Sequence, residues 1–261
     1  MNRLDKELVI RKLVDTRTKA QELIENSVVL VNNKVQTKTS FQVNDQDDII
    51  IKENQILKYV SRGGFKLEKA LQSFDYNIKD KTVMDIGSST GGFTDCALQN
   101  GAKKCICIDV GSNVMHPTLR NNPNIDLHEN TNIRDLDHKF FKVSDVIVID
   151  VSFVSLEKII EKIASEQIIV DIICLIKPQF ECGKNIAKKY NGIIKDKTIH
   201  KNVITNVINY FNKHKFYISS LDFSPIKGGD GNIEYLALFT NKTTLNNEID
   251  ILETISTAHN N

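Results

Sequence analysis

A glycine-rich turn that follows a short apolar run is the first feature of this chain that could do chemistry. The segment 82–95 reads TVMDIGSSTGGFTD. Val83–Ile86 predicts a buried strand, and the pattern from Phe93 to Asn100 predicts a helix after the glycines. Glycine lets the backbone pass close to a ligand, and free amides at a helix start favour polar or anionic groups. We therefore predict a ligand-binding strand, turn and helix.

The spacing of this turn distinguishes two kinds of ligand. A dinucleotide fingerprint, G-x-G-x-x-G, would need glycine at Ser89 as well as at Gly92, and only Gly92 is present. The pattern Asp-x-Gly-x-x-x-Gly-Gly instead resembles the first motif of S-adenosylmethionine (SAM) methyltransferases. A turn that binds nothing is the plain alternative. The SAM interpretation assigns these positions to cofactor binding: Asp85, Gly87, Ser88, Ser89, Thr90, Gly91, Gly92 and Phe93.

Two more acids follow predicted strands further along the chain. Asp109 stands near the end of the predicted strand 104–110, where a carboxylate can accept hydrogen bonds from ribose hydroxyls. Asp135 follows a weak strand at 125–128 and could meet the amino group of adenine. A helix cap is the alternative role for Asp135.

Three ionisable residues lie at the ends of buried strands. Asp150 and Lys177 directly end the apolar runs 145–150 and 170–176, and the carboxyl ends of parallel strands are where α/β sheets place their ligands. Lys177 is either a solvated loop charge or a site residue beside Asp150, and its strand-end position favours the site. Glu234 stands in the otherwise apolar final strand 233–239, where a buried carboxylate needs a partner.

Strands alternate with helices from residue 82 onward, which predicts an α/β fold with a mostly parallel, Rossmann-like, three-layer sheet of seven strands. The last two strands are joined only by a nine-residue loop, so we expect this pair to be antiparallel. Two helical patterns and short strands at 28–31, 34–37 and 49–51 predict a small α+β module before the sheet. The predicted domains are residues 1–58 and 59–243, followed by a tail, 244–261.

Composition narrows the class of protein. No apolar run is long enough to cross a bilayer, and the charged N-terminus has no secretory apolar region, so a cytoplasmic location is expected. The five cysteines lack C-x-x-C spacing and the six histidines form no ligand motif, so we predict no metal. Residues 1–38 carry eight Lys or Arg against five Asp or Glu, a local net charge of +3 in a chain of net +1.

The basic residues at the start of the chain decorate the two predicted helices. They are Arg3, Arg11, Lys12, Arg17 and Lys19. A solvated face is the plain interpretation, but RLDKELVIRKLVDTRTKAQELI followed by VLVNNKV resembles the S-four RNA-binding domain over about residues 2–52. That resemblance implies contacts to phosphates of structured RNA, which give affinity with little sequence specificity. Arg62, beside the predicted joint at 63–64, is added to the RNA-binding set.

Five blocks in order extend a resemblance over nearly the whole chain. They are YVSRGGFKLEKAL (59–71), VMDIGSSTGGFTD (83–95), DVSFVSL (150–156), LIKPQFECGK (175–184) and GNIEYL (231–236). Together they resemble the TlyA family, S-four-bearing relatives of the FtsJ/RrmJ ribose methyltransferases. The resemblance implies 2′-O-methylation of a cytidine in ribosomal RNA with SAM as donor. It also implies a Lys-Asp-Lys-Glu tetrad, which falls on Lys66, Asp150, Lys177 and Glu234.

The resemblance leaves several points open. Lys177 is either the general base or the group that stabilises the developing alkoxide: burial and Lys66 would lower its pKa, and Asp150 and Glu234 would raise it. The chain begins almost at the RNA-binding helices, so we expect the shorter family form, a monomer that acts on large-subunit (23S) RNA. Haemolysin labels in the family are expected to reflect an indirect effect.

Two other functions compete with this one. RNA-base N-methyltransferases carry an Asn/Asp-Pro-Pro-aromatic turn, whereas this chain has Asp150-Val-Ser-Phe153 without prolines. A non-catalytic ribosome-binding or assembly factor would bind RNA without transferring a methyl group.

Overall fold

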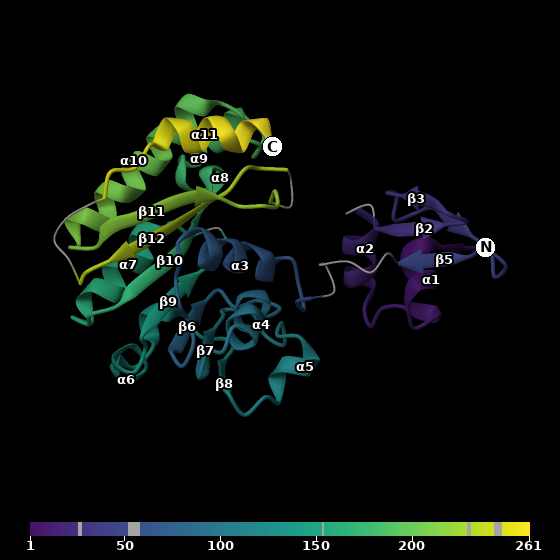
Figure 1. The fold of residues 1–261 in the computed structure, drawn as a ribbon, viewed down its shortest axis with the longest axis horizontal. Coiled ribbons are helices and arrows are strands. Elements are labelled where there is room, and N and C mark those ends of the chain that lie inside the picture. Colours follow the sequence, from purple (N-terminus) through teal and green to yellow (C-terminus); the bar gives the residue numbers. More distant parts are fainter. Residues whose placement is uncertain (26–27, 52–57, 153, 229–230, 243–246) are drawn as a thin grey trace. The chain divides into compact units, whose positions relative to one another are not determined.

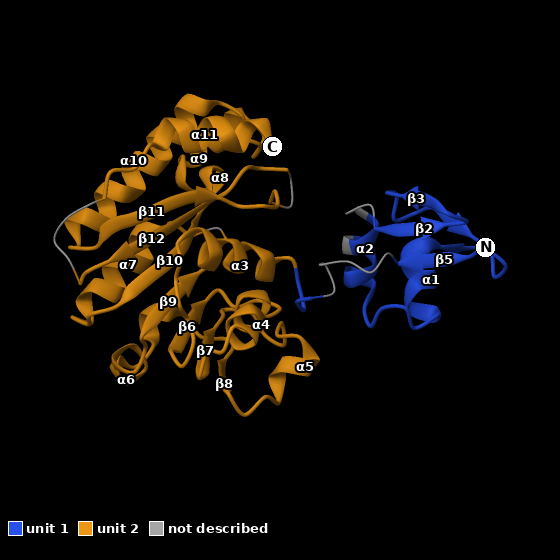
Figure 2. Ribbon diagram, in the orientation of Figure 1, with its two compact units in different colours: residues 1–61 blue, residues 62–261 orange. Residues whose placement is uncertain are grey.

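The computed structural model describes residues 1–25, 28–51, 58–152, 154–228, 231–242 and 247–261 (Figure 1). The chain divides into two compact units, Met1–Ser61 and Arg62–Asn261 (Figure 2). Phe153 and the predicted domain boundary at 243–244 lie outside the described residues. Within the described ranges, no helix is both long and apolar enough to cross a membrane.

The first unit is a small α+β module. Its helices are α1 (Leu4–Ile10) and α2 (Arg17–Glu25). Its strands are β1 (Asn2–Arg3), β2 (Val29–Val31), β3 (Lys34–Gln36), β4 (Gln42–Val43) and β5 (Ile49–Ile51); β3, β2 and β5 form an antiparallel sheet in that order, and β1 pairs with β4. Asn32 and Asn33 join β2 to β3 with φ of 50° and 62°, which suits the right-handed twist of a two-residue hairpin. The predicted S-four-like arrangement is confirmed.

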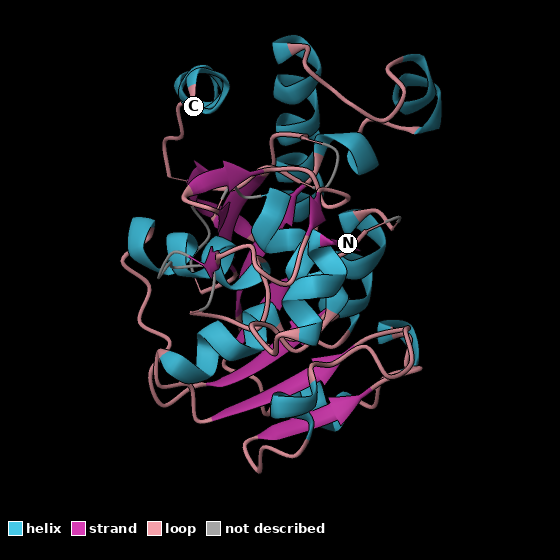
Figure 3. Ribbon diagram, turned by 90° about the vertical axis from the view of Figure 1, so that its right-hand side faces the viewer, coloured by secondary structure: helices cyan, strands magenta, loops and turns pink. Residues whose placement is uncertain are grey.

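The second unit is built on a seven-stranded sheet in the order β11-β12-β10-β9-β6-β7-β8. Figure 3 shows the strands in magenta. The strands are β6 (Thr82–Ile86), β7 (Lys104–Ile108), β8 (Ile125–His128), β9 (Val146–Ile149), β10 (Asp171–Ile176), β11 (Tyr217–Phe223) and β12 (Tyr235–Thr240). All residues of β9 and β10 are buried, and apart from Asp171 at the start of β10 all are apolar. The predicted seven-stranded, mostly parallel sheet with an antiparallel last pair is confirmed.

Helices cover both faces of this sheet. The helices of the second unit are α3 (Gly63–Ser73), α4 (Gly92–Gln99), α5 (Pro117–Arg120), α6 (His138–Lys142), α7 (Leu156–Ser165), α8 (Pro178–Glu181), α9 (Lys184–Lys189), α10 (Lys197–Lys213) and α11 (Ile251–Asn260), with a 3-10 turn, η2 (Ile133–Asp135). α3 and α4 pack together on one face, while α7, α10 and α11 share a large apolar core with the other (Figure 1). The four shortest helices were not predicted, because one or two turns leave little apolar periodicity to detect.

The position of β12 brings the tetrad together. β6, β7, β9 and β10 are mutually parallel, so their carboxyl ends share one edge of the sheet. β12 runs antiparallel between β10 and β11, and Tyr235 pairs with Ile176. The amino end of β12 therefore meets the carboxyl end of β10, and Glu234 and Lys177 arrive at the same edge.

Candidate active site

The four tetrad side chains form one chain of ion pairs. The Lys66 Nζ lies 2.6 Å from Glu234 Oε2 and 3.5 Å from Asp150 Oδ2. The Lys177 Nζ lies 2.5 Å from Asp150 Oδ1 and donates a hydrogen bond to Ser152 Oγ at 3.2 Å. Two amines and two carboxylates from α3, β9, β10 and β12 therefore converge on one place.

Burial and charge oppose each other in this group. Lys66, Lys177 and Glu234 are each less than a tenth exposed. Burial alone would raise the pKa of Asp150, but the two lysines outweigh it and hold that pKa below its usual value. Burial would also lower the pKa of Lys66, but Asp150 and Glu234 outweigh it and the pKa is raised. Lys66 is therefore firmly charged, and charge pairing prevails over desolvation at both groups.

Neighbouring residues hold Glu234 in place. Gln179, on α8, donates a hydrogen bond from Nε2 to Glu234 Oε1 at 3.3 Å. A Cβ on Gly228 would stand 2.6 Å from the same oxygen, so a glycine is needed where this loop passes the carboxylate. Glu181, also on α8, accepts bonds from Ser155 Oγ and the Leu156 amide, which fixes the loop after Asp150. None of these supporting residues was predicted.

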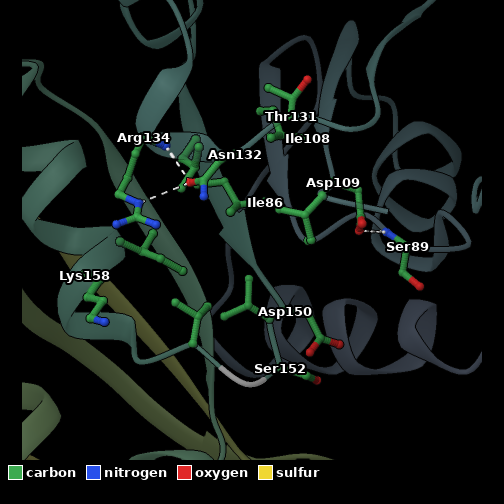
Figure 4. Close-up of a pocket in the computed structure, with 16 residues that line it drawn as sticks. Ile86, Ser89, Ile108, Asp109, Thr131, Asn132, Arg134, Asp150, Ser152 and Lys158 are labelled. Atoms are coloured by element: carbon green, nitrogen blue, oxygen red, sulfur yellow. Dashed lines mark hydrogen bonds between the residues drawn. The ribbon is translucent and has the colours of Figure 1, made fainter. Parts of the chain in front are cut away.

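A cavity of about 360 Å³ opens beside Asp150, the one tetrad residue in its lining (Figure 4). Asp150 and Ser152 line one end, and Gly87, Ser89 and Asp109 line the side formed by the glycine-rich turn. The rest of the lining is mainly apolar and includes Ile86, Ile108, Val110, Ile133, Val151, Val154 and Ile159. A volume of this size with a few polar groups is typical of a small-molecule site.

The glycine-rich turn has the shape that the sequence predicted. Gly87 and Gly91 have φ of 81° and 92°, and Ser89 has φ of 47°. A Cβ on Gly87 would lie 2.6 Å from the backbone oxygen of Asp150, so the turn lies directly against the strand end that carries Asp150. The Ser88 hydroxyl is buried and, within the described part of the chain, has no hydrogen-bond partner. Of the turn, Gly87 and Ser89 line the cavity.

Asp109 and Asp85, both predicted to bind the cofactor, have different positions relative to the cavity. Asp109 accepts hydrogen bonds from the Ser89 amide at 2.8 Å and the Gly111 amide at 2.7 Å, and it lines the cavity. Asp85 is fully buried and accepts a 2.6 Å bond from Thr94 Oγ1, which ties α4 to β6. Burial raises the pKa of Asp85 to about 7. Asp85 supports the turn from within and is not part of the cavity lining.

The far side of the cavity differs most from the prediction. Asp135 is exposed at the end of η2 and is not among the lining residues, whereas Thr131, Asn132 and Arg134 are. Asn132 caps η2, accepting from the Arg134 amide at 3.1 Å. An asparagine at a turn is a detectable signal, because its side chain tends to accept from the backbone amide two residues further on.

The basic residues of the first unit lie around buried acids. Asp5 Oδ2 is 2.9 Å from both Arg17 and Gln21, and Asp5 Oδ1 is 3.0 Å from Arg3. Burial would raise the pKa of Asp5, but the hydrogen bonds from Arg3, Gln21 and Arg17 lower it strongly. Arg11 pairs with Glu7 at 2.9 Å. The guanidinium groups of this surface are therefore held in fixed positions.

The remaining predicted RNA-binding residues are surface or boundary positions. Lys12 is exposed in a left-handed backbone conformation after α1, and Lys19 is half-buried on α2. Arg62 begins the second unit as the residue before α3. Their contact with RNA stays a prediction.

Family models match both units. The FtsJ-like methyltransferase model matches residues 59–241, and the S4 domain model matches residues 2–49. The chain therefore belongs to the FtsJ-like methyltransferase family and carries an S4 domain in its first unit. Within that family its relatives include the TlyA proteins, as the resemblance in the sequence implied.

The relatives match over most of their length. YqxC of Bacillus subtilis, named as a candidate rRNA methyltransferase, is 42% identical over 90% of this chain and 84% of its own. The 23S rRNA (cytidine-2'-O)-methyltransferase TlyA of Campylobacter jejuni is 38% identical over 87% of this chain and 95% of its own. A solved Streptococcus thermophilus structure, described as a candidate hemolysin, is 36% identical over 99% of this chain and 95% of its own, with a TM-score of 0.78.

Proposed function

We propose that this protein transfers the methyl group of SAM to the 2′-oxygen of a cytidine in 23S ribosomal RNA. The observation that carries the proposal is the convergence of Lys66, Asp150, Lys177 and Glu234 at the end of a cavity lined by the glycine-rich turn. A protein that modifies ribosomal RNA would work in the cytoplasm.

The cavity residues fit SAM. Asp109 keeps lone pairs free for ribose hydroxyls, and the apolar lining suits an adenine ring. Thr131 and Asn132 replace Asp135 as the residues proposed beside the adenine. When bound, SAM supplies an activated methyl group on a sulfonium.

The tetrad then needs only to position the hydroxyl and handle its proton. Lys177 would contact the 2′-oxygen and stabilise negative charge on it while its proton passes to water. The O–CH3 bond would form as the S–CH3 bond breaks, which would leave S-adenosylhomocysteine as the second product. Asp150 orients Lys177 through the 2.5 Å ion pair, and Lys66 and Glu234 hold Asp150 in turn. With two positive and two negative groups, the tetrad adds no net charge next to the sulfonium.

The first unit would bring the RNA to this centre. Arg3 and Arg17 remain partly exposed while Asp5 fixes them, so they can meet phosphates without a large loss of side-chain entropy.

Methyl mapping on ribosomal RNA tests the proposal. Ribosomal large subunits incubated with the full chain and labelled SAM should gain one 2′-O-methylcytidine, detected as a bond resistant to alkali. Lys177→Ala should abolish transfer while SAM binding persists. If the methyl label appears on a base, and is still transferred when the target nucleotide lacks its 2′-hydroxyl, the protein is an N-methyltransferase. RNA binding without any methyl transfer would indicate an assembly factor.

A further inference from the structure

The segment 183–197 is the most basic stretch of the second unit. It contains five lysines, at positions 184, 188, 189, 195 and 197, and a single acid, Asp196. All five lysines are exposed, and within the described ranges none of them forms a salt bridge. We call these five side chains the lysine surface.

The helix at the centre of this segment has no core of its own. α9 buries none of its residues, and Ile186 is 38% exposed. Most helices gain their stability by burying an apolar face. α9 therefore contributes little to the apolar core of the second unit.

Buried polar groups nevertheless hold the segment firmly. Asn232, 2% exposed, donates from Nδ2 to the Gly192 carbonyl at 2.8 Å and accepts from the Ile194 amide at 2.9 Å. The fully buried His200 bonds the Ile194 carbonyl through Nε2 at 2.9 Å. A carbonyl only accepts, so Nε2 carries the proton and Nδ1 accepts from the Tyr235 hydroxyl at 2.7 Å.

These anchors tie the lysine surface to the tetrad. The segment begins just after α8, whose Gln179 donates a hydrogen bond to Glu234. Further along the segment, the Ile194 amide bonds Asn232, which lies two residues before Glu234. Figure 1 shows α9 beside α8. Lys177 is the residue directly before α8. The backbone that carries the lysines is therefore anchored to the same loop and helix that hold Glu234.

We infer that the lysine surface binds backbone phosphates of the single-stranded RNA that flanks the target nucleotide. This inference rests on the proposed function. Charge complementarity favours RNA as the occupant, because phosphates recur along a strand and lysines bind them as point charges without reading the base. The surface adds a second RNA contact, on the catalytic unit, to that of the S4 domain.

The test compares two triple variants of the full chain with equal charge loss. Lys184→Gln/Lys188→Gln/Lys189→Gln removes the centre of the lysine surface. Lys79→Gln/Lys103→Gln/Lys142→Gln removes three exposed lysines near the amino ends of the parallel strands, at the opposite edge of the sheet. Large-subunit RNA binding is measured by filter retention from 50 to 200 mM salt, together with SAM binding and thermal melting.

The first variant should weaken RNA binding about tenfold and reduce the slope of log affinity against log salt by about 2, since each single-strand phosphate contact contributes about 0.7. Its SAM affinity and melting temperature should match the wild type, and Lys→Arg at the same positions should restore RNA binding. Equal RNA binding by the two variants would overturn the inference. Because binding is read without methyl transfer, failure of the proposed reaction in the wild type would appear separately.

Discussion

The Lys66 ammonium lies 2.6 Å from the Glu234 carboxylate, although 168 positions separate the two residues in the chain. One comes from the first helix of the catalytic unit and the other from its last strand. Glu234 and Asp150 together raise the pKa of Lys66, which keeps its ammonium charged. Asp150 interacts with both lysines, and they lower its pKa.

Glu234→Gln should keep the shape of the side chain and an oxygen that can accept from Lys66, but it removes the negative charge that pairs with Lys66. Lys66 retains only Asp150, at 3.5 Å, so the ion-pair chain loosens at Lys177. We expect kcat to fall at least about 100-fold and the free energy of unfolding to fall by about 1–3 kcal/mol. Steady-state kinetics and urea unfolding measure both, with exposed Glu253→Gln as the control. An active Glu234→Gln protein would contradict the role of the tetrad.

Lys177→Arg should separate the two possible roles of Lys177. A guanidinium stays protonated and cannot accept a proton, but it can still stabilise an oxyanion. If stabilisation dominates, as we propose, Lys177→Arg should retain roughly 1% of wild-type activity and exceed Lys177→Ala. Single-turnover methylation measures both variants. Equal inactivity, with a wild-type rate that rises tenfold per pH unit, would instead assign Lys177 as the general base.

Asp109→Ala should act mainly on cofactor affinity. The change removes the acceptor proposed for the ribose hydroxyls and the two bonds that hold Ser89 and Gly111. We expect SAM affinity to fall about 10- to 100-fold, or about 1.4–2.8 kcal/mol, measured by titration calorimetry. Asp135→Ala is the matched control, because Asp135 lies outside the cavity lining, and its SAM affinity should stay within about twofold of the wild type.

Asp5→Asn should weaken RNA binding without touching an RNA-facing group. Arg3 and Arg17 would lose the charge that orients them. We expect about a fivefold loss of RNA affinity, measured by filter retention, and an unchanged affinity for SAM. The pKa of Asp5 is lower in the folded state than in the unfolded state, so its stabilising effect is present at neutral pH and is lost as the pH falls below about 4. In Asp5→Asn, the free energy of unfolding should therefore depend less on pH below about 4 than in the wild type.

His200 should make the second unit less stable in mild acid. Burial lowers the pKa of His200, and its two hydrogen bonds fix the neutral tautomer. The unfolded chain takes up the proton near pH 6.5 while the folded chain resists it, so the free energy of unfolding should fall as the pH drops below about 6.5. Urea midpoints at pH 7.5 and 5.5 measure this, and His200→Gln should reduce the difference. His259, 3.3 Å away, contributes in the same direction.

The sequence predicted the central strands well, because strands that are buried on both faces read as largely apolar runs. β9 and β10 are examples: every residue is buried, and the acid or lysine that ends each run marks the site edge. Sequence position also predicted Asp109 at the cavity. The tetrad itself required the family resemblance, since no local pattern relates α3 to β12.

What the sequence could not supply were contacts that depend on three-dimensional proximity. Gln179 reaches Glu234 and Asn232 reaches Ile194 only because α8 and the loop before β12 meet at one edge. The position of Asp135 depends on the same kind of proximity: Asn132 and Arg134 line the cavity, whereas Asp135 at the end of η2 is exposed and outside the lining.

The place of β12 in the sheet has a consequence during synthesis on the ribosome. β11 pairs with β12 and not with β10, so a nascent chain that ends at Phe223 holds one strand with no partner in the sheet. The residue that completes the charge pairing, Glu234, emerges only with the strand that closes this gap. A chain interrupted before that point has neither a finished sheet nor a complete tetrad, so competence to modify RNA appears only once nearly the whole polypeptide has been made.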